Sequence, residues 1–275
     1  MTNDTESPRA WRTVLEHVER RLLDGDLRPG DRLPGERALA TDLGVGRSSV
    51  REAVRVLEAM GLIRTASGSG PNAGAIIIAT PGGAMSALMR LQVAAHGFPV
   101  ADIVRTRLIL ETSVAGELAE RGGAGLETPR SSTGATGAST TTGEPGASAA
   151  DLTSADALLD AMDSPDLDPS EFLALDAAFH LALAEASGNQ VIIATMAGLR
   201  SGIEGYALDG LARIVDWPAT SARLRREHRG IVEAIRATDA AAARTRTHDH
   251  ISGYYAETMP EPQIDPHALE ETSSW

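Results

Sequence analysis

Residues 36–55 decide how the N-terminal part of this chain folds, and they read Glu-Arg-Ala-Leu-Ala-Thr-Asp-Leu-Gly-Val-Gly-Arg-Ser-Ser-Val-Arg-Glu-Ala-Val-Arg. Apolar residues recur at helical spacing on both sides of Gly44-Val45-Gly46, which predicts two short helices joined by a tight turn. A glycine in that turn permits the positive φ that the chain reversal requires. The stretch therefore predicts a helix-turn-helix.

The second helix of this pair is basic on one face. Arg47, Arg51 and Arg55 are four residues apart and line one side of it, and Ser48 and Ser49 stand at its start. Arginine can bond guanine edges or phosphates, and hydroxyl groups can bond phosphates or base edges. We expect this helix to enter the major groove of DNA. The alternative interpretation is a solvated helix that has no partner.

The flanking segments extend the motif. Periodicity predicts a helix over about residues 10–23, and β-rich residues predict strands over 62–65 and 75–79 with a turn-rich segment between them. A helix, a helix-turn-helix and a hairpin together make a winged helix-turn-helix. We assign residues 1–80 to this DNA-binding domain.

The same region resembles the N-terminal domain of the GntR-family transcription regulators. The resemblance lies in Pro29-Gly-Asp-Arg-Leu-Pro-Gly-Glu-Arg37, Gly44-Val45, Arg47 and Val50-Arg-Glu-Ala53. It implies DNA contacts from two helices and from the tip of the wing, namely from Arg37, Arg47, Ser48, Ser49, Arg51, Gly68 and Gly70. Gly46 stands where the family usually has Ser or Thr, so we expect one phosphate contact to be missing.

Composition limits the remaining possibilities. The 275 residues suggest two domains. The net charge is −13, but residues 1–80 contain eleven Arg and eleven acidic residues, so all the excess acid lies in the second part. An acidic second domain repels DNA and leaves binding to the arginines of the first, because affinity depends on local neutralisation of phosphates.

Two residue types are missing altogether. Without cysteine, the chain has no disulfides and no thiolate metal site, and without lysine it cannot form a Schiff base with pyridoxal phosphate. No apolar run is long enough to span a bilayer, and no signal peptide opens the chain. We expect a cytoplasmic protein with no membrane partner.

The second part is predicted to be an all-α antiparallel helical bundle over residues 84–260, so that the whole chain is mainly α. Its expected helices span about 84–95, 103–121, 152–162, 169–186, 190–211, 219–237 and 240–258. Residues 122–150 are rich in Gly, Ser, Thr, Ala and Pro, which predicts a disordered insertion. Residues 261–275 are expected to form a tail.

Four side chains in the predicted bundle are candidate metal ligands. Asp176 and His180 are four residues apart on one helix and point the same way, whereas His228 and His250 are 22 residues apart. In one straight helix these two would lie about 33 Å apart, but Thr238-Asp239 is typical of an N-cap that starts a new helix and permits an antiparallel return.

One carboxylate and three imidazoles suit a divalent Zn, Ni, Co or Mn ion with positions left open for water or a ligand. His248 competes with His250, because residues two apart point to different sides of a helix and only one of them can serve. The alternative is that these are ordinary bundle residues at chance spacing.

Several segments are similar to the FCD ligand-binding domain of the FadR-type branch of the same family. They are Arg107-Leu-Ile-Leu-Glu111, Asp176-Ala-Ala-Phe-His180, Ser187-Gly-Asn189, Glu227-His228 and His250-Ile251. The resemblance implies a divalent metal on Asp176, His180, His228 and His250. It also implies a carboxylate-bearing effector, for which Arg107 is a candidate clamp; the alternative for Arg107 is an ion pair with Glu111. Asn189 is expected to cap the helix that follows it.

These observations favour a metabolite-responsive transcription regulator. We expect a homodimeric repressor that binds a palindromic operator and a small organic acid. The alternative is a metal-dependent hydrolase or lyase fused to a DNA-binding domain. That enzyme would need a general base, for which Glu111 and Glu204 are conceivable.

Overall fold

The computed structural model describes residues 10–66, 74–78, 82–124, 150–164 and 167–258. The chain forms two compact units, Met1–Leu88 and Met89–Trp275. This division falls inside one helix, somewhat later than the boundary expected between residues 80 and 84.

The first unit is a winged helix-turn-helix. It contains α1 (Ala10–Leu23), α2 (Glu36–Leu43), α3 (Arg47–Ala59), β1 (Ile63–Ala66) and β2 (Gly74–Ile77). The two strands are antiparallel, with Ile63 opposite Ile77, and both side chains are buried. A second group of buried side chains, from Val14, Leu39, Val50 and Ala53, joins the three helices. The predicted fold of this region is therefore confirmed.

The turn between α2 and α3 depends on Gly44. Its φ is 64°, in the left-handed region, and its N–H bonds the carbonyls of Ala40 and Thr41 at the end of α2. A residue with a Cβ would be strained in this conformation. The glycine thus ends α2 and sets the direction in which α3 begins.

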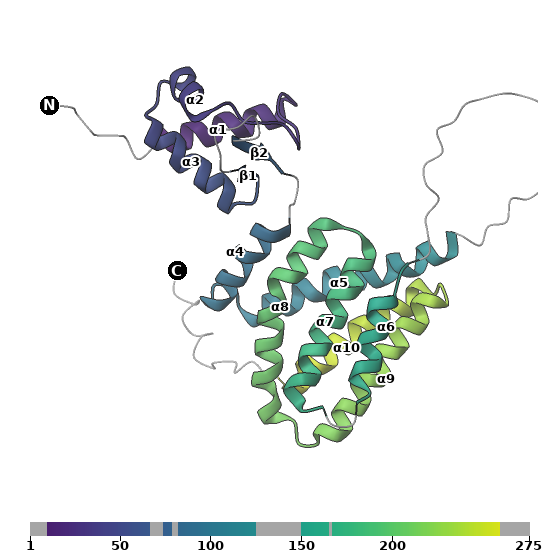
Figure 1. Cartoon of the computed structure of the whole chain (residues 1–275). Helices are drawn as coiled ribbons and strands as arrows, with labels where there is room; N and C mark the ends of the chain where they lie inside the picture. Colours follow the sequence, from purple (N-terminus) through teal and green to yellow (C-terminus); the bar gives the residue numbers. More distant parts are fainter. Residues whose placement is uncertain (1–9, 67–73, 79–81, 125–149, 165–166, 259–275) are drawn as a thin grey trace, which may run out of the picture. The chain divides into compact units, whose positions relative to one another are not determined.

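The second unit is a helical bundle, as predicted. Its elements are the second half of α4 (Gly82–Ala94), α5 (Val100–Ala124), α6 (Thr153–Met162), α7 (Pro169–Ser187), α8 (Gln190–Gly210), the short η1 (Leu211–Arg213), α9 (Trp217–Arg236) and α10 (Ala240–Thr258). Helix α5 packs against α7, α8, α9 and α10, as can be followed in Figure 1. Side chains from all of these helices meet in one continuous apolar core.

Side-chain caps fix the residue at which two of the helices with candidate ligands begin. Asp168 accepts hydrogen bonds from the N–H groups of Ser170 and Glu171, and the Glu171 side chain accepts one from the N–H of Asp168, so α7 begins with a capping box. Asp239 accepts from the N–H of Ala242 at 2.9 Å and starts α10. Asn189 accepts from the N–H groups at the start of α8, as predicted. Because Asp239 starts α10 only three residues after α9 ends, and the two helices pack together, the polypeptide reverses direction between them.

One predicted boundary is wrong. Helix α5 continues to Ala124, so Gly122 is helical and does not begin an insertion. The apolar face of α5 is buried in the bundle up to Ala119, and the last turn still packs against neighbouring segments. Arg121 Nη1 donates to the carbonyl of Ser187 at 2.6 Å, and a Cβ at Gly122 would lie 3.2 Å from Cγ2 of Thr238. The rest of the predicted insertion, residues 125–149, and the predicted tail lie outside the described residues.

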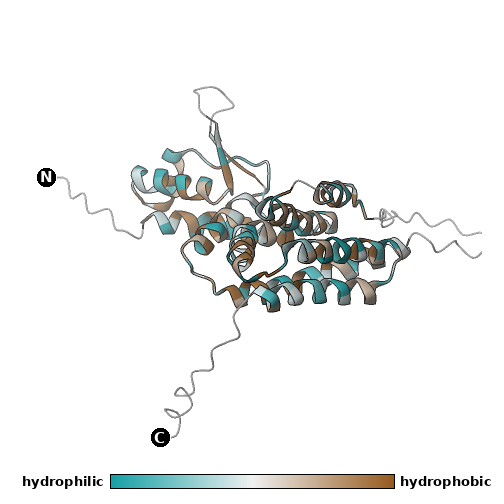
Figure 2. Cartoon of the chain, turned by 90° about the horizontal axis from the view of Figure 1, so that it is seen from below, coloured by the Kyte–Doolittle hydropathy of each residue, from teal (hydrophilic) through white to brown (hydrophobic). Residues whose placement is uncertain are grey.

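Within the described ranges, no helix has the length and apolar character needed to cross a membrane. Figure 2 shows that hydrophobic and hydrophilic residues alternate along the helices of both units. Helices of this kind bury one side and expose the other to water.

Candidate functional site

The candidate DNA-binding face lies on α3 and its neighbour α2. Arg37, Arg47, Ser48 and Arg51 are all exposed. Ser49 differs, because its side chain is buried with an exposed fraction of 4%. It therefore packs against the domain core and is not on the open face. Gly68 and Gly70, the predicted wing-tip contacts, lie outside the described residues.

Arg51 is held by an acidic side chain from α2. Its Nη2 lies 3.1 Å from Oε2 of Glu36, and its Nε lies 3.5 Å from Oε1 of the same carboxylate. The hydrogen bond to Glu36 is the main reason why the pKa of Arg51 is raised. Both partners are substantially exposed, so the pair is open to competition from phosphates or bases.

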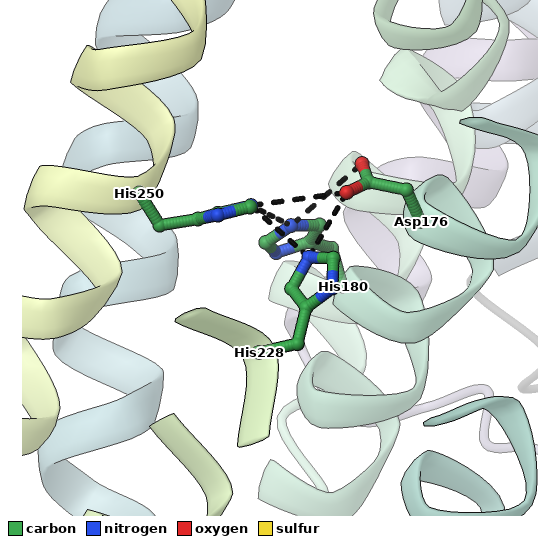
Figure 3. A group of neighbouring side chains, drawn as sticks. All are labelled: Asp176, His180, His228 and His250. Atoms are coloured by element: carbon green, nitrogen blue, oxygen red, sulfur yellow. Dashed lines mark hydrogen bonds and ion pairs between the residues drawn. The ribbon is translucent and has the colours of Figure 1, made fainter. Parts of the chain in front are cut away.

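The second candidate site is a cluster of four buried side chains from three helices. Asp176 and His180 come from α7, His228 from α9 and His250 from α10 (Figure 3). Their ligand atoms all lie within 4.8 Å of one another. His250 Nε2 is 3.1 Å from Nε2 of His180 and 3.1 Å from Nε2 of His228. Asp176 Oδ1 is 2.9 Å from Nε2 of His228.

His248 does not join this cluster. Its side chain is 57% exposed and lies beside Asp249 on the surface of α10. Of the two histidines that the sequence left open, the structure brings only His250 to the other three side chains.

The spacing of the nitrogen atoms fits one metal ion. Two nitrogens bound to the same ion at about 2.05 Å lie roughly 2.9 Å apart at a right angle and roughly 3.4 Å apart at a tetrahedral angle. The two separations of 3.1 Å lie between these limits. Three imidazoles and one carboxylate form a donor set suited to Zn, Ni, Co or Mn. The residues present therefore fit a divalent metal.

Two further carboxylates contact the imidazole nitrogens that face away from the cluster. Glu227 Oε2 accepts a hydrogen bond from Nδ1 of His250 at 2.9 Å. Glu111 Oε2 lies 2.5 Å from Nδ1 of His180. An ionised carboxylate can only accept, so the hydrogen bond with Glu227 places the proton of the His250 ring on Nδ1. The contact between Glu111 and His180 is close but lacks the geometry of a hydrogen bond. The Nε2 lone pair of His250 then faces Nε2 of His180, and a cation bound between the two nitrogens would stabilise this arrangement.

Burial favours the neutral form of two of the imidazoles, those of His228 and His250. It lowers the pKa of His250 to about 4, and the neighbouring His228 contributes to the same shift. Burial also lowers the pKa of His228. Burial alone would raise the pKa of Asp176, but the hydrogen bond from His228 and the adjacent imidazoles outweigh it and hold that pKa far below its usual value. Neutral imidazoles beside an ionised carboxylate are the protonation states that bind metal.

Arg107 lies next to this cluster and is almost fully buried. Its Nε donates to Glu111 Oε1 at 2.7 Å, and its Nη1 donates to the hydroxyl group of Tyr206. The ion pair that was the alternative for Arg107 is therefore present. Its Nη2 is buried and has no hydrogen-bond partner among the described residues, so one nitrogen of the guanidinium is left unpaired.

Burial alone would raise the pKa of Glu111, but the charge of Arg107 and the contact with His180 outweigh it and lower that pKa to about 2. Glu111 thus remains ionised. Glu204, the other conceivable base, lies on α8 and pairs with Arg200 at 2.7 Å.

Sequence reasoning missed the contacts of Glu227 and Tyr206. Glu227 could have been noticed because Arg223 precedes it by four residues, the same spacing as Arg107 and Glu111. Tyr206 is 99 residues away from Arg107, and no sequence pattern links the two.

Comparison with known families agrees with the two units. Residues 11–71 match the model of the bacterial regulatory proteins of the gntR family, and residues 144–253 match the FCD domain. The first match includes the exposed arginines of α2 and α3. The second match includes all four clustered side chains. It begins after Arg107 and Glu111, so it does not include them.

Two curated relatives match over most of the chain. The HTH-type transcriptional regulator LutR of Bacillus subtilis is 28% identical over 250 residues, covering 86% of this chain and 99% of the relative. The Glc operon transcriptional activator of Escherichia coli is 26% identical over 238 residues, covering 86% of this chain and 84% of the relative.

A solved structure of a GntR protein from Streptococcus agalactiae covers 90% of this chain and 99% of its own length, with a TM-score of 0.54 and 24% identity. This likeness supports the fold. The relatives are transcription regulators, so the enzyme that was the alternative hypothesis is not supported.

Proposed function

We propose that this chain, a transcription regulator of the GntR family that carries an FCD domain, changes its affinity for operator DNA when a small carboxylate binds at a metal ion in its helical unit. The observation that carries the proposal is the convergence of three imidazoles and one carboxylate in the bundle core. A buried group of this kind costs stability unless a cation or a ligand uses it.

In this proposal Asp176, His180, His228 and His250 hold the metal ion. When bound, the ion supplies an electrophilic centre with open positions for the oxygens of an acid. Arg107 holds the other end of the acid or its second oxygen through Nη2, the guanidinium nitrogen that no described residue occupies. A short organic acid suits this arrangement better than a long acyl chain, because the groups offered are ionic.

The DNA side of the proposal rests on α3. Arg47 and Ser48 contact the major groove from its exposed start, and Arg37 and Arg51 contact phosphates or bases beside it. We propose that two copies of the chain bind together, so that two α3 helices occupy successive major grooves of a palindromic operator. Ser49 is left out of this contact set because it is buried.

The acid must bind one arrangement of the dimer better than the other in order to change DNA affinity. We propose repression that the acid relieves.

The experiment is a selection of genomic DNA fragments with the purified full-length protein, followed by release of the bound fragment. Short organic acids are added one at a time, with Zn²⁺ and after chelation. The proposal predicts that one class of acid changes DNA affinity and that chelation removes the effect. An acid response that persists in the chelated protein would contradict the role of the metal.

A further inference from the structure

Two arginine–glutamate pairs in the bundle have the same construction. On α5, Arg107 Nε donates to Oε1 of Glu111 at 2.7 Å, and on α9, Arg223 Nη1 donates to Oε1 of Glu227 at 2.8 Å. In both pairs the glutamate follows the arginine by four residues, so the two side chains lie on one helix face.

The second oxygen of each glutamate contacts a clustered histidine from another helix. Oε2 of Glu111 lies 2.5 Å from Nδ1 of His180 on α7, and Oε2 of Glu227 lies 2.9 Å from Nδ1 of His250 on α10. Each glutamate thus has one oxygen on an arginine and the other on an imidazole.

We propose that Glu111 and Glu227 are positioning residues, which orient His180 and His250 so that both Nε2 atoms face the metal position with a free lone pair. This inference rests on the proposed metal site and extends it to residues outside the ligand set. A carboxylate that accepts from Nδ1–H fixes both the tautomer and the rotation of the ring, and it makes the ring a stronger ligand.

The arginines keep the carboxylates in place. Without a partner, a glutamate side chain can adopt many rotamers. Arg223 is itself held by Glu257, whose Oε1 accepts from the Thr220 hydroxyl group at 2.8 Å. The side chains that hold Glu227 therefore join α9 to α10 beside the cluster. Arg107 and Glu111, by contrast, are both buried in the core.

The third imidazole has no such support. Nδ1 of His228 has no hydrogen-bond partner within the part of the chain that the structure describes, and its Nε2 pairs with Asp176. The rings of His180 and His250 thus each have a carboxylate oxygen beside Nδ1, through an ion-pair contact in His180 and a hydrogen bond in His250. The ring of His228 has no such oxygen and contacts Asp176 instead.

An arginine–glutamate pair with the same spacing in α8 serves as a natural control. Arg200 Nε donates to Glu204 Oε1 at 2.7 Å, but within the described residues Glu204 makes no contact with the cluster. Removing Glu204 therefore removes an equivalent pair and leaves the histidines untouched.

The test compares Glu227→Ala, Glu227→Gln and Glu204→Ala in the full-length protein by calorimetric titration with Zn²⁺. Loss of the hydrogen bond to a ligand histidine is expected to lower Zn²⁺ affinity by about 10- to 100-fold in Glu227→Ala. Glu227→Gln is expected to recover part of the loss, because the amide oxygen can still accept from Nδ1–H. Glu204→Ala is expected to bind as the wild type does.

A second readout separates this inference from the metal proposal. Long-range ¹H–¹⁵N spectra of the metal-free wild type are expected to show His180 and His250 protonated on Nδ1, and His250 is expected to lose that preference in Glu227→Ala. If the wild type does not bind Zn²⁺, the metal proposal fails while the tautomer measurement still applies. Wild-type affinity in Glu227→Ala, or protonation of His250 on Nε2 in the wild type, would overturn the inference.

Discussion

His180 Nε2 and His250 Nε2 lie 3.1 Å apart, although 70 residues separate them in the sequence. Each ring has a carboxylate oxygen close to its Nδ1, from Glu111 and Glu227 respectively. With a proton on each Nδ1, as proposed above, both facing nitrogens carry lone pairs. Such a contact is unfavourable in a buried, empty site. We therefore expect the metal ion to contribute to the stability of the helical unit as well as to effector binding.

Replacing a ligand histidine tests the cluster directly. His228→Ala removes one of four proposed ligands and is expected to lower Zn²⁺ affinity by more than about 100-fold, beyond the loss typical for a supporting residue. Calorimetric titration checks this, and the acid response should disappear with the metal. His248→Ala is the matched control, because His248 is exposed and lies outside the cluster. Unchanged metal stoichiometry in His228→Ala would make His228 a structural residue.

Replacing Arg47 tests the DNA-binding face. Arg47→Ala is expected to lower specific operator affinity by about 10- to 100-fold, because a bidentate arginine contact to guanine is lost. The thermal stability of the helical unit should not change. Arg20→Ala removes the same charge from α1 and should weaken binding only slightly. Fluorescence anisotropy with labelled operator DNA measures both variants, and a full-strength footprint with Arg47→Ala would refute its role.

The ion pair between Arg51 and Glu36 leads us to expect a substitution that raises DNA affinity. Glu36→Gln frees the guanidinium and removes a negative charge close to the phosphates. We expect DNA affinity to rise, by about two- to fivefold, since exposed pairs are weak. Glu19→Gln on α1 is the control for the change in net charge. Weaker binding by Glu36→Gln would mean that Glu36 orients Arg51 for DNA and does not compete with it.

Replacing two glycines of α8 with alanine is expected to change the stability of the helical unit in opposite directions. A Cβ at Gly198 would lie 2.6 Å from Cβ of Met89 on α4, so Gly198→Ala is expected to lower the free energy of unfolding by about 1–3 kcal/mol. A Cβ at Gly205 meets nothing within 4 Å, so Gly205→Ala should raise it by about 0.5–1 kcal/mol. Urea denaturation measures both. Equal effects would show that α4 does not pack against α8 in solution.

Much of the fold was predictable because the deciding signals are local. The helix starts at Pro169, Gln190 and Ala240 follow side-chain caps that are visible in the sequence. The turn at Thr238-Asp239 also allowed His228 and His250 to be placed together, since it reverses the chain between them. The end of α5 was placed too early because Gly122 and Gly123 suggested a helix end that packing and continuity override.

The supporting contacts of the cluster were not predictable, because they depend on tertiary packing. The contact of Arg107 with the Tyr206 hydroxyl group comes from α8, 99 residues further along the chain. The burial of Ser49 likewise depends on how α3 rotates against the other helices, and a hydroxyl at a helix start does not reveal this.

Metal analysis of the purified full-length protein, with and without prior chelation and paired with a thermal-shift screen of short organic acids, tests the central claim most directly. We predict one divalent ion per chain and stabilisation by one class of acid that disappears on chelation and returns when the metal is restored. A protein that takes up no metal on incubation with Zn²⁺, Ni²⁺, Co²⁺ or Mn²⁺, and that no acid stabilises, would contradict the account of the effector site.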